Sequence, residues 1–524
     1  MSVSKYRFLR MSSLAVAVTT LCAVTACSTD AESSSGAGAL TIAMPADPTC
    51  LDPQQTGQLA ATDVSRSLVD TLTDQDPETG KIVPWLAESY EVKNDAKTFD
   101  FTLRSGVTFS DGTPVDASAV KATFDKLVTL PATGAPAYVR GYTGTTVVDP
   151  LHFSISFATS NAQFLQATSL TGLGILSAAT ANAPLADRCR GAFVGSGPFV
   201  LDHYTPNQEV VLKKRADYAW PSSRSQNTGA AHLDEVHYLF VPEEGARTSA
   251  LASGQVQVAE NVQSTDRQQF DGNGFRLLSD RLPGAVAPLS LNHVGVLADE
   301  RVRKALLIGM DRKELVDAII GPQAAPATSV LASSTPFYAA TDKLRFDPDQ
   351  AEQLLTDAGW TPGPDGIRIS DGRKLSLQWL IPAPASPDKE YIQQQFAKIG
   401  IDIVLNIVPP ATYVDQQNAG NFDLTAVGVT RADPDVLRNL FSSTGQNLWH
   451  LPASELDTYL NQQAAATDDA TRQVAVTNAV NWLLDHADTV PLYENAQVHA
   501  VSDQVVELAT DASSRLNLHS AKLG

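Results

Sequence analysis

The clearest alternation of apolar and polar residues covers residues 90–107. Phe99, Phe101 and Leu103 fall on one side of its second half, and Asn94-Asp95 lies in the middle. Alternation with a period of two is typical of a strand with one buried face, and a polar pair between two such runs favours a turn. This stretch therefore predicts a β-hairpin.

The next segments change to a helical period. Asp111-Gly112-Thr113-Pro114 predicts a tight turn, and Asp116 can cap a helix. We expect the buried face of that helix to contain Val120, Phe124, Leu127 and Val128. Residues 233–258 then predict a strand, a short helix that ends at Gly254 and a second strand, which together form a βαβ unit.

The C-terminal half alternates helical and strand-like stretches. It predicts strands at 289–292, 375–381, 401–408 and 422–429, and helices at 299–320, 347–358 and 387–399. This order indicates an α/β fold with an open sheet, in which ligands bind beyond the carboxyl ends of the strands. About 500 residues exceed what one hydrophobic core usually holds, so two or more lobes are expected.

The N-terminus predicts export. Lys5, Arg7 and Arg10 precede an apolar stretch at 11–24 that is shorter than a membrane-spanning helix of roughly 20 residues. Val24-Thr25-Ala26-Cys27 resembles a bacterial lipobox, so we expect a signal peptide at 1–26, a lipid on Cys27, and a flexible tether within 27–38. The alternative is an ordinary signal peptide followed by a chance cysteine.

Charge and cysteine content narrow the possibilities further. The chain has 58 acidic and 38 basic side chains and a formal net charge of −20, which argues against binding to nucleic acid. Cys22 is removed with the signal peptide, which leaves Cys50 and Cys189 to form a candidate disulfide in an exported protein. A metal site is the alternative, but it needs a closer cluster of ligands.

Motifs of the common enzyme classes are missing. The chain has no G-x-x-x-x-G-K-[ST], H-E-x-x-H or C-x-x-C, and Pro198 interrupts a nucleophile elbow at Gly195-Ser196-Gly197. His232 and His237 are five residues apart in a predicted strand and would face opposite sides. We therefore expect no enzyme activity, no cofactor and no metal.

A series of short motifs resembles the family 5 extracellular solute-binding proteins of ABC importers, which take up peptides and nickel complexes. In order, they are Leu51-Asp52-Pro53, Leu86-Ala87-Glu88-Ser89, Leu103-Arg104-x-Gly106-Val107-x-Phe109, Asp111-Gly112-Thr113-Pro114, Gly195-Ser196-Gly197-Pro198-Phe199, Arg301-Val302-Arg303-Lys304-Ala305-Leu306 with Met310-Asp311-Arg312, and Leu354-Leu355-x-x-Ala358-Gly359-Trp360. They span most of the exported chain.

The resemblance implies a periplasmic-binding-protein-like type II fold, with two lobes that close on a ligand and a smaller α+β domain. On that pattern, domain I comprises 39–75, 193–288 and 491–524, domain II comprises 76–192, and domain III comprises 289–490. It also implies a monomer outside the membrane that delivers its ligand to a permease and an ATPase.

One loop departs from the family pattern. In peptide-binding members, an aspartate in a W-x-x-D-Y-x-D-P loop pairs with the ammonium group of the peptide. Aligning Asp433-Pro434 places Thr430 at the aspartate position and Arg431 at the aromatic position. Thr430 supplies no charge, whereas the fork of donors on Arg431 suits a carboxylate. Alternatively, Arg431 pairs only with Asp433 or Asp435.

Further candidate ligand contacts are Asn292 and His293, Trp449 and His450, and residues 45–54. Trp449 and His450 could stack on a ligand, although an aromatic residue in a large core is more often simply buried. A binder of a non-peptide solute, such as an anionic metabolite or a nickel chelate, is the main alternative function. A peptide-sensing receptor and a lipid-anchored hydrolase are two others, although no nucleophile supports the latter.

Overall fold

The computed structural model describes residues 38–130 and 134–524. The predicted signal peptide, Cys27 and nearly all of the tether lie outside the described residues. Within the described ranges, no helix is both long and apolar enough to cross a membrane.

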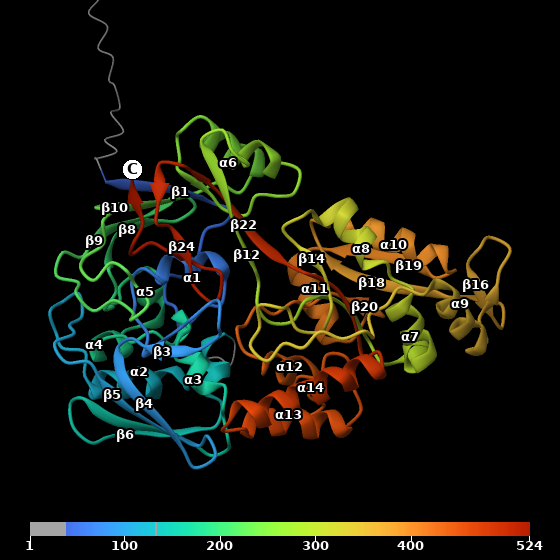
Figure 1. Ribbon diagram of the computed structural model, residues 1–524, viewed down its shortest axis with the longest axis horizontal. Coiled ribbons are helices and arrows are strands. Elements are labelled where there is room, and N and C mark those ends of the chain that lie inside the picture. Colours follow the sequence, from blue (N-terminus) through green and yellow to red (C-terminus); the bar gives the residue numbers. More distant parts are fainter. Residues whose placement is uncertain (1–37, 131–133) are drawn as a thin grey trace, which may run out of the picture. The chain divides into compact units, whose positions relative to one another are not determined.

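The first sheet has seven strands in the order β12-β22-β11-β1-β10-β9-β8 (Figure 1). Its strands are β1 (Ala39–Met44), β8 (Phe199–Thr205), β9 (Glu209–Lys214), β10 (Glu235–Phe240), β11 (Val258–Ala259), β12 (Phe275–Arg281) and β22 (Ala496–Ser502). Strands β10 and β11 both pair in parallel with β1, and helix α6 (Glu244–Ala252) connects them. The predicted βαβ unit is therefore confirmed, with the N-terminal strand inserted at its centre.

The second sheet contains the predicted hairpin. Strands β4 (Ala87–Lys93) and β5 (Thr98–Leu103) pair antiparallel, and β7 (His152–Phe157) and β6 (Tyr142–Val147) extend the sheet. Asn94 and Asp95 adopt positive φ in the turn. Phe99, Phe101 and Leu103 are all buried, because alternate side chains of β5 point into the core.

Helix α2 (Ala117–Leu127) begins where the sequence predicted. The Asp116 carboxylate accepts a hydrogen bond from the Ala119 N–H at 2.9 Å, as an N-cap should. Val120, Phe124 and Leu127 are buried, but Val128 is 43% exposed. The prediction for Val128 is wrong because the helix ends at Leu127 and Val128 occupies its C-cap.

The third sheet has six strands in the order β14-β21-β13-β20-β18-β19. Its strands are β13 (Ala287–Leu291), β14 (Ala325–Pro326), β18 (Ser376–Pro382), β19 (Asp402–Val408), β20 (Leu424–Thr425) and β21 (Thr489–Glu494). Strand β18 is parallel to both β19 and β20. The main helices around this sheet are α7 (Glu300–Ile308), α8 (Arg312–Leu315), α9 (Pro348–Asp357), α10 (Asp388–Lys398), α11 (Pro410–Asn418), α12 (Val436–Phe441), α13 (Glu455–Ala465) and α14 (Asp469–Asp485).

The remaining elements are short. They are α1 (Leu59–Ser65), the 3-10 turn η1 (Ala135–Val139), α3 (Phe164–Ala167), α4 (Ala178–Ala181), α5 (Leu185–Cys189), and the strand pairs β2 (Thr73–Gln75) with β3 (Ile82–Pro84), β23 (Val505–Val506) with β26 (Lys522–Leu523), and β24 (Ala509–Thr510) with β25 (Leu516–Asn517). Strands β15 (Thr361–Pro362), β16 (Arg368–Ser370) and β17 (Arg373–Lys374) form a small meander.

Two predicted elements of the C-terminal half differ from the structure. The single helix expected at 299–320 is interrupted after α7, where Gly309 packs against Ile399 and Asp311 caps α8 through the Glu314 N–H. The strand expected at 422–429 is reduced to β20. At the end of the predicted strand, the Val429 carbonyl accepts a hydrogen bond from the Ala285 N–H of the segment after β12 instead.

The Gly195-Ser196-Gly197 motif has a packing role. A Cβ atom on Gly195 would lie 2.1 Å from the Leu68 carbonyl oxygen, and one on Gly197 would lie 2.5 Å from the Leu68 carbonyl carbon. Only glycine allows the two backbones to approach this closely.

Two chain segments connect the first sheet to the third. One leads from β12 to β13, and the other leads from β21 to β22. The segments run side by side, and the Leu282 N–H donates to the Asn495 carbonyl at 2.9 Å (Figure 1). These two crossing segments therefore carry the covalent link between the two larger sheets.

Candidate ligand-binding site

The loop at residues 428–435 follows the carboxyl end of β20 and packs against the first crossing segment. Thr430 forms an antiparallel bridge with Gly284, and the Arg431 N–H donates to the Pro283 carbonyl at 2.9 Å. Gly284 has a φ of +111°, and a Cβ atom there would lie 2.3 Å from the Val429 carbonyl oxygen. A glycine at 284 is therefore what allows the loop to lie directly on the crossing segment.

Buried charges in and around this loop are paired in an ordered way. One Asp433 oxygen accepts a hydrogen bond from Arg472 at 2.7 Å. Asp435 receives two bonds from Arg438, at 2.7 and 2.9 Å, and a third bond from the Gln463 amide. Each of the two carboxylates thus has its own hydrogen-bonded arginine.

Arg431 is the exception. Its side chain is only 1% exposed, and its Nη1 lies 3.8 Å from an Asp435 oxygen that Arg438 already occupies. The guanidinium carbon lies 4.4 Å from the centre of the Tyr138 ring. Among the residues that the structure describes, neither Nε nor Nη2 has a hydrogen-bond partner. The sequence left open whether Arg431 pairs with Asp433 or with Asp435. Asp433 binds Arg472 instead, and Arg431 forms only a longer ion pair with Asp435.

A groove of about 550 Å³ is lined in part by the same loop, through Ala432 and Asp433. Its other lining residues include Arg472 and, from a distant part of the chain, Gln75, Lys81 and Gln166. The Gln75 amide donates to the Ala432 carbonyl at 3.0 Å, which joins these two parts of the chain. Residues that are far apart in the chain therefore meet around residues 430–433.

The second group of candidates lies elsewhere. The Asn292 N–H donates to the Asp423 carbonyl, and the His293 N–H donates to the Trp449 carbonyl. Since β13 runs antiparallel to β20, these residues are at the edge of the sheet opposite Thr430. The structure therefore does not bring Asn292, His293 or His450 to the Arg431 loop, whereas the Trp449 side chain lies with Ala285 and Val427 around a small internal cavity.

Each of these four residues has a local structural contact. The Asn292 amide donates to the Phe422 carbonyl at 2.8 Å, and its oxygen lies 2.8 Å from His450 Nδ1. Trp449 is 2% exposed and packs in the core. Burial, reinforced by Arg303, lowers the pKa of His293 to about 4, so its ring is neutral at pH 7.

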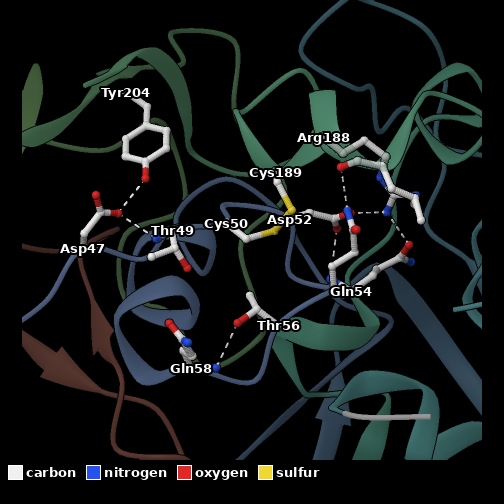
Figure 2. The surroundings of a disulfide bond; sticks show 12 residues. Asp47, Thr49, Cys50, Asp52, Gln54, Thr56, Gln58, Arg188, Cys189 and Tyr204 are labelled. Carbon is white, nitrogen blue, oxygen red and sulfur yellow. Dashed lines mark hydrogen bonds and ion pairs between the residues drawn. A yellow bond between two sulfur atoms is a disulfide. The ribbon is translucent and has the colours of Figure 1, made fainter. Parts of the chain in front are cut away.

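The candidate loop at residues 45–54 is fixed by covalent and ionic contacts (Figure 2). Cys50 and Cys189 form a disulfide, and Asp52 pairs with Arg188 at 2.8 Å. Asp47 accepts a hydrogen bond from the Tyr204 hydroxyl at 2.6 Å. This loop follows the carboxyl end of β1, and these contacts limit its freedom to move.

No group of three or more metal-ligating side chains occurs within 38–130 and 134–524. His237 lies 3.1 Å from Glu235 and 4.0 Å from Glu209, and His232 is exposed. No sequence signal pointed to Tyr138, Gln75 or Arg472, because their contacts with residues 431–433 are made only through the fold.

Comparison with known proteins places this arrangement among transport proteins. The family model described as bacterial extracellular solute-binding proteins, family 5 Middle, matches residues 81–448. The periplasmic murein peptide-binding protein MppA of Escherichia coli is 26% identical over 486 residues, which cover 86% of each chain. The oligopeptide-binding protein AppA of Bacillus subtilis is 27% identical over 420 residues, 74% of this chain and 73% of AppA.

Solved structures share the fold. NikA from Brucella suis in complex with Fe(III)-EDTA superimposes with a TM-score of 0.82 at 22% identity, covering 93% of this chain and 100% of NikA. AppA from Bacillus subtilis in complex with a nonapeptide gives a TM-score of 0.74 at 21% identity, covering 93% and 99%. The fold is thus the predicted two-lobe, type II α/β architecture.

Proposed function

This chain belongs to the family 5 bacterial extracellular solute-binding proteins, and from that premise we propose that it captures a peptide or a similar small polar solute outside the membrane. It then delivers the solute to the permease of an ABC importer. The observation that carries the proposal is the family match over residues 81–448. Relatives named for murein peptide and oligopeptide binding support a peptide as the first choice of solute.

The connection between the lobes supports capture by closure. Only the two crossing segments link the seven-stranded and six-stranded sheets through the chain, and the Thr430 loop is bonded to one of them. A solute that contacts this loop would therefore also influence the crossing segment. Hinged closure around a ligand is a common mechanism of binding proteins.

The residues proposed to contact the solute are Thr430 and Arg431, with Asp433 in a supporting position through Arg472. Residues 45–54 would contribute from the carboxyl edge of the first sheet. The functional units are proposed to be domain I (39–75, 193–288 and 491–524), domain II (76–192) and domain III (289–490). Closure would bring domains I and III together on the solute.

A non-peptide solute is the second candidate. Thr430 and Arg431 replace the acidic and aromatic positions expected in a peptide-binding loop. A neighbour of the same fold was solved with Fe(III)-EDTA, a polycarboxylate chelate. These two observations favour an anionic metabolite or a metal chelate as the alternative cargo.

Anchoring is proposed to occur through a lipid on Cys27, with 1–26 removed as a signal peptide. The sequence Val24-Thr25-Ala26-Cys27 supports this proposal. Two acyl chains would hold the protein stably at the membrane surface, where one would not. A Cys27→Ser variant should partition into the aqueous phase of a detergent extraction, whereas a wild-type protein that also partitions there would contradict the anchor.

Native mass spectrometry of the protein purified from its own cells tests the function directly. Peptides of mixed sequence that co-purify with the protein, and bind it again in calorimetry, would support the peptide proposal. A single chelate or acidic metabolite would support the second candidate. Release of hydrolysed product from a bound peptide would contradict a role in binding alone.

A further inference from the structure

We propose that Arg431 is the anion-binding residue of the solute site, and that together with Thr430 it receives a carboxylate of the transported molecule. This inference rests on the proposed function, because it names the chemical class that the binding site accepts. It predicts a solute held by its negative end at residues 430–431, in place of one held by its ammonium group.

The pairing of buried charges around the loop supports this proposal. Three arginines in and around the loop, Arg431, Arg438 and Arg472, form ion pairs with two carboxylates, Asp433 and Asp435. Asp468 and Asp469 line the neighbouring groove. Asp433 and Asp435 are both engaged by hydrogen bonds from Arg438 and Arg472. Arg431 is therefore a nearly fully buried cation for which the described residues provide no hydrogen-bonded counter-ion.

An arginine cannot escape this situation by losing its proton. The guanidinium stays charged at any physiological pH, and a buried, uncompensated charge is costly. The Tyr138 ring covers one face of the group and offers a cation–π contact, but it accepts no hydrogen bond in the plane of the guanidinium. An incoming carboxylate would supply a closer counter-charge than Asp435 and acceptors for Nε and Nη2.

Thr430 adds a second donor at the same place. Its side chain is half-buried, and its hydroxyl can both donate and accept a hydrogen bond. The bridge to Gly284 and the bond from the Arg431 N–H to Pro283 hold both residues by their backbone. A fixed backbone that presents side-chain donors is the arrangement expected of a preorganised binding site.

The test compares matched probes on four versions of the full-length protein: wild type, Arg431→Gln, Arg431→Lys and the exposed control Arg345→Gln. Native mass spectrometry measures binding of a synthetic pool of di- to pentapeptides without acidic side chains, and of the same pool amidated at the C-terminus. Citrate serves as a non-peptide carboxylate. Circular dichroism of each variant confirms that it is folded.

The wild type and Arg345→Gln should prefer the free carboxylate over the amide by roughly 10- to 100-fold. Arg431→Gln should lose that preference to within about threefold, and Arg431→Lys should retain part of it, because lysine keeps the charge but not the fork. Arg431-dependent binding of citrate without any peptide binding would support the anion site while refuting the peptide proposal.

Three results would overturn the inference. The first is equal binding of the free and amidated pools by the wild type. The second is a carboxylate preference that survives unchanged in Arg431→Gln. The third is failure of the wild type to bind either the peptide pools or citrate.

Discussion

Two buried arginines illustrate the two uses of charge in this fold. Arg188, in the short helix α5, has a side chain with no exposed surface and is paired through Nη2 with Asp52 and Gln54 (Figure 2). Arg431, beside the crossing segment, is buried to nearly the same degree but has no hydrogen-bonded carboxylate among the described residues. Arg188 also has two buried nitrogens, Nε and Nη1, without a hydrogen-bond partner. Neither burial nor unpartnered nitrogens therefore distinguish the two arginines; the distance to the counter-ion does, at 2.8 Å for Arg188 and 3.8 Å for Arg431.

A buried carboxyl makes the contrast sharper. Asp70 is fully buried among Ser196, Tyr218 and Trp220, and burial raises its pKa to about 7. A carboxyl group in this position can become neutral by binding a proton, whereas an arginine keeps its charge. The absence of a hydrogen-bonded counter-ion is therefore more informative at Arg431 than at Asp70.

The largest effect is expected when the partner of Arg188 is removed. Asp52→Ala leaves the Arg188 charge buried without compensation, so it should lower the free energy of unfolding by about 3–5 kcal/mol. Urea unfolding followed by circular dichroism measures this. Asp317→Ala, which breaks an exposed pair with Lys313, should cost about 0–1 kcal/mol. Equal effects of the two substitutions would refute a structural role for the Asp52–Arg188 pair.

The disulfide beside that pair gives the next prediction. It joins positions 139 residues apart, so replacing Cys50 and Cys189 by serine should reduce stability by about 2–5 kcal/mol. A reducing agent should lower the unfolding midpoint of the wild type toward that of the double variant and leave the variant unchanged. A wild-type midpoint that does not respond to reduction would contradict this expectation.

Asp70 predicts a dependence of stability on pH. Burial raises the pKa of Asp70 from 3.8 to about 7, so the folded protein binds this proton more tightly than the unfolded chain does. The resulting contribution to the free energy of unfolding is fully present below about pH 4 and is lost as the pH rises to about 7. The stability of the wild type relative to Asp70→Asn should therefore fall by up to about 4 kcal/mol between pH 4 and pH 8.

The comparison with Asp70→Asn is needed because other buried groups also titrate in this range. Burial raises the pKa of Asp63 to about 6 and lowers that of His499 to about 3, and the two shifts have opposite effects on stability. An exposed control, Asp415→Asn, should show no such trend. A difference between the wild type and Asp70→Asn that is constant across pH would contradict the prediction.

A smaller effect is expected at Arg438, which competes with Arg431 for Asp435. Arg438→Gln would release Asp435 to approach Arg431, now 3.8 Å away, and so partly neutralise the proposed anion site. The affinity for a carboxylate solute should fall by roughly 3- to 10-fold, in line with about 1 kcal/mol. Calorimetry measures this change, and an increase in affinity would contradict the proposed competition.

The sequence predicted the locally determined parts of this architecture. The alternation around Phe99 and the cap at Asp116 depend on neighbours a few residues away, and both are correct. The break after α7 was missed because the apolar period continues past Gly309, the C-cap of α7, and Asp311, the N-cap of α8.

The same limit applies to the candidate site. The unusual Thr430-Arg431 pair was evident because neighbouring motifs could be aligned, but its surroundings were not. Tyr138 and Arg472 come from other elements, and only the fold shows that Arg472 takes Asp433 and leaves Arg431 without that partner. The position of Asn292 relative to the loop was not evident either, because it depends on the direction of β13.

The most direct test of the central claim is the melting temperature of Arg431→Gln, measured without and with a saturating amount of the solute that co-purifies with the wild type. Without solute, the variant should melt at the wild-type temperature or slightly above it, because it loses a buried charge that has no hydrogen-bonded partner. With solute, the stabilisation seen in the wild type should disappear. A variant that melts well below the wild type without solute, yet keeps the full solute-dependent increase, would show that Arg431 is structural in the way Arg188 is.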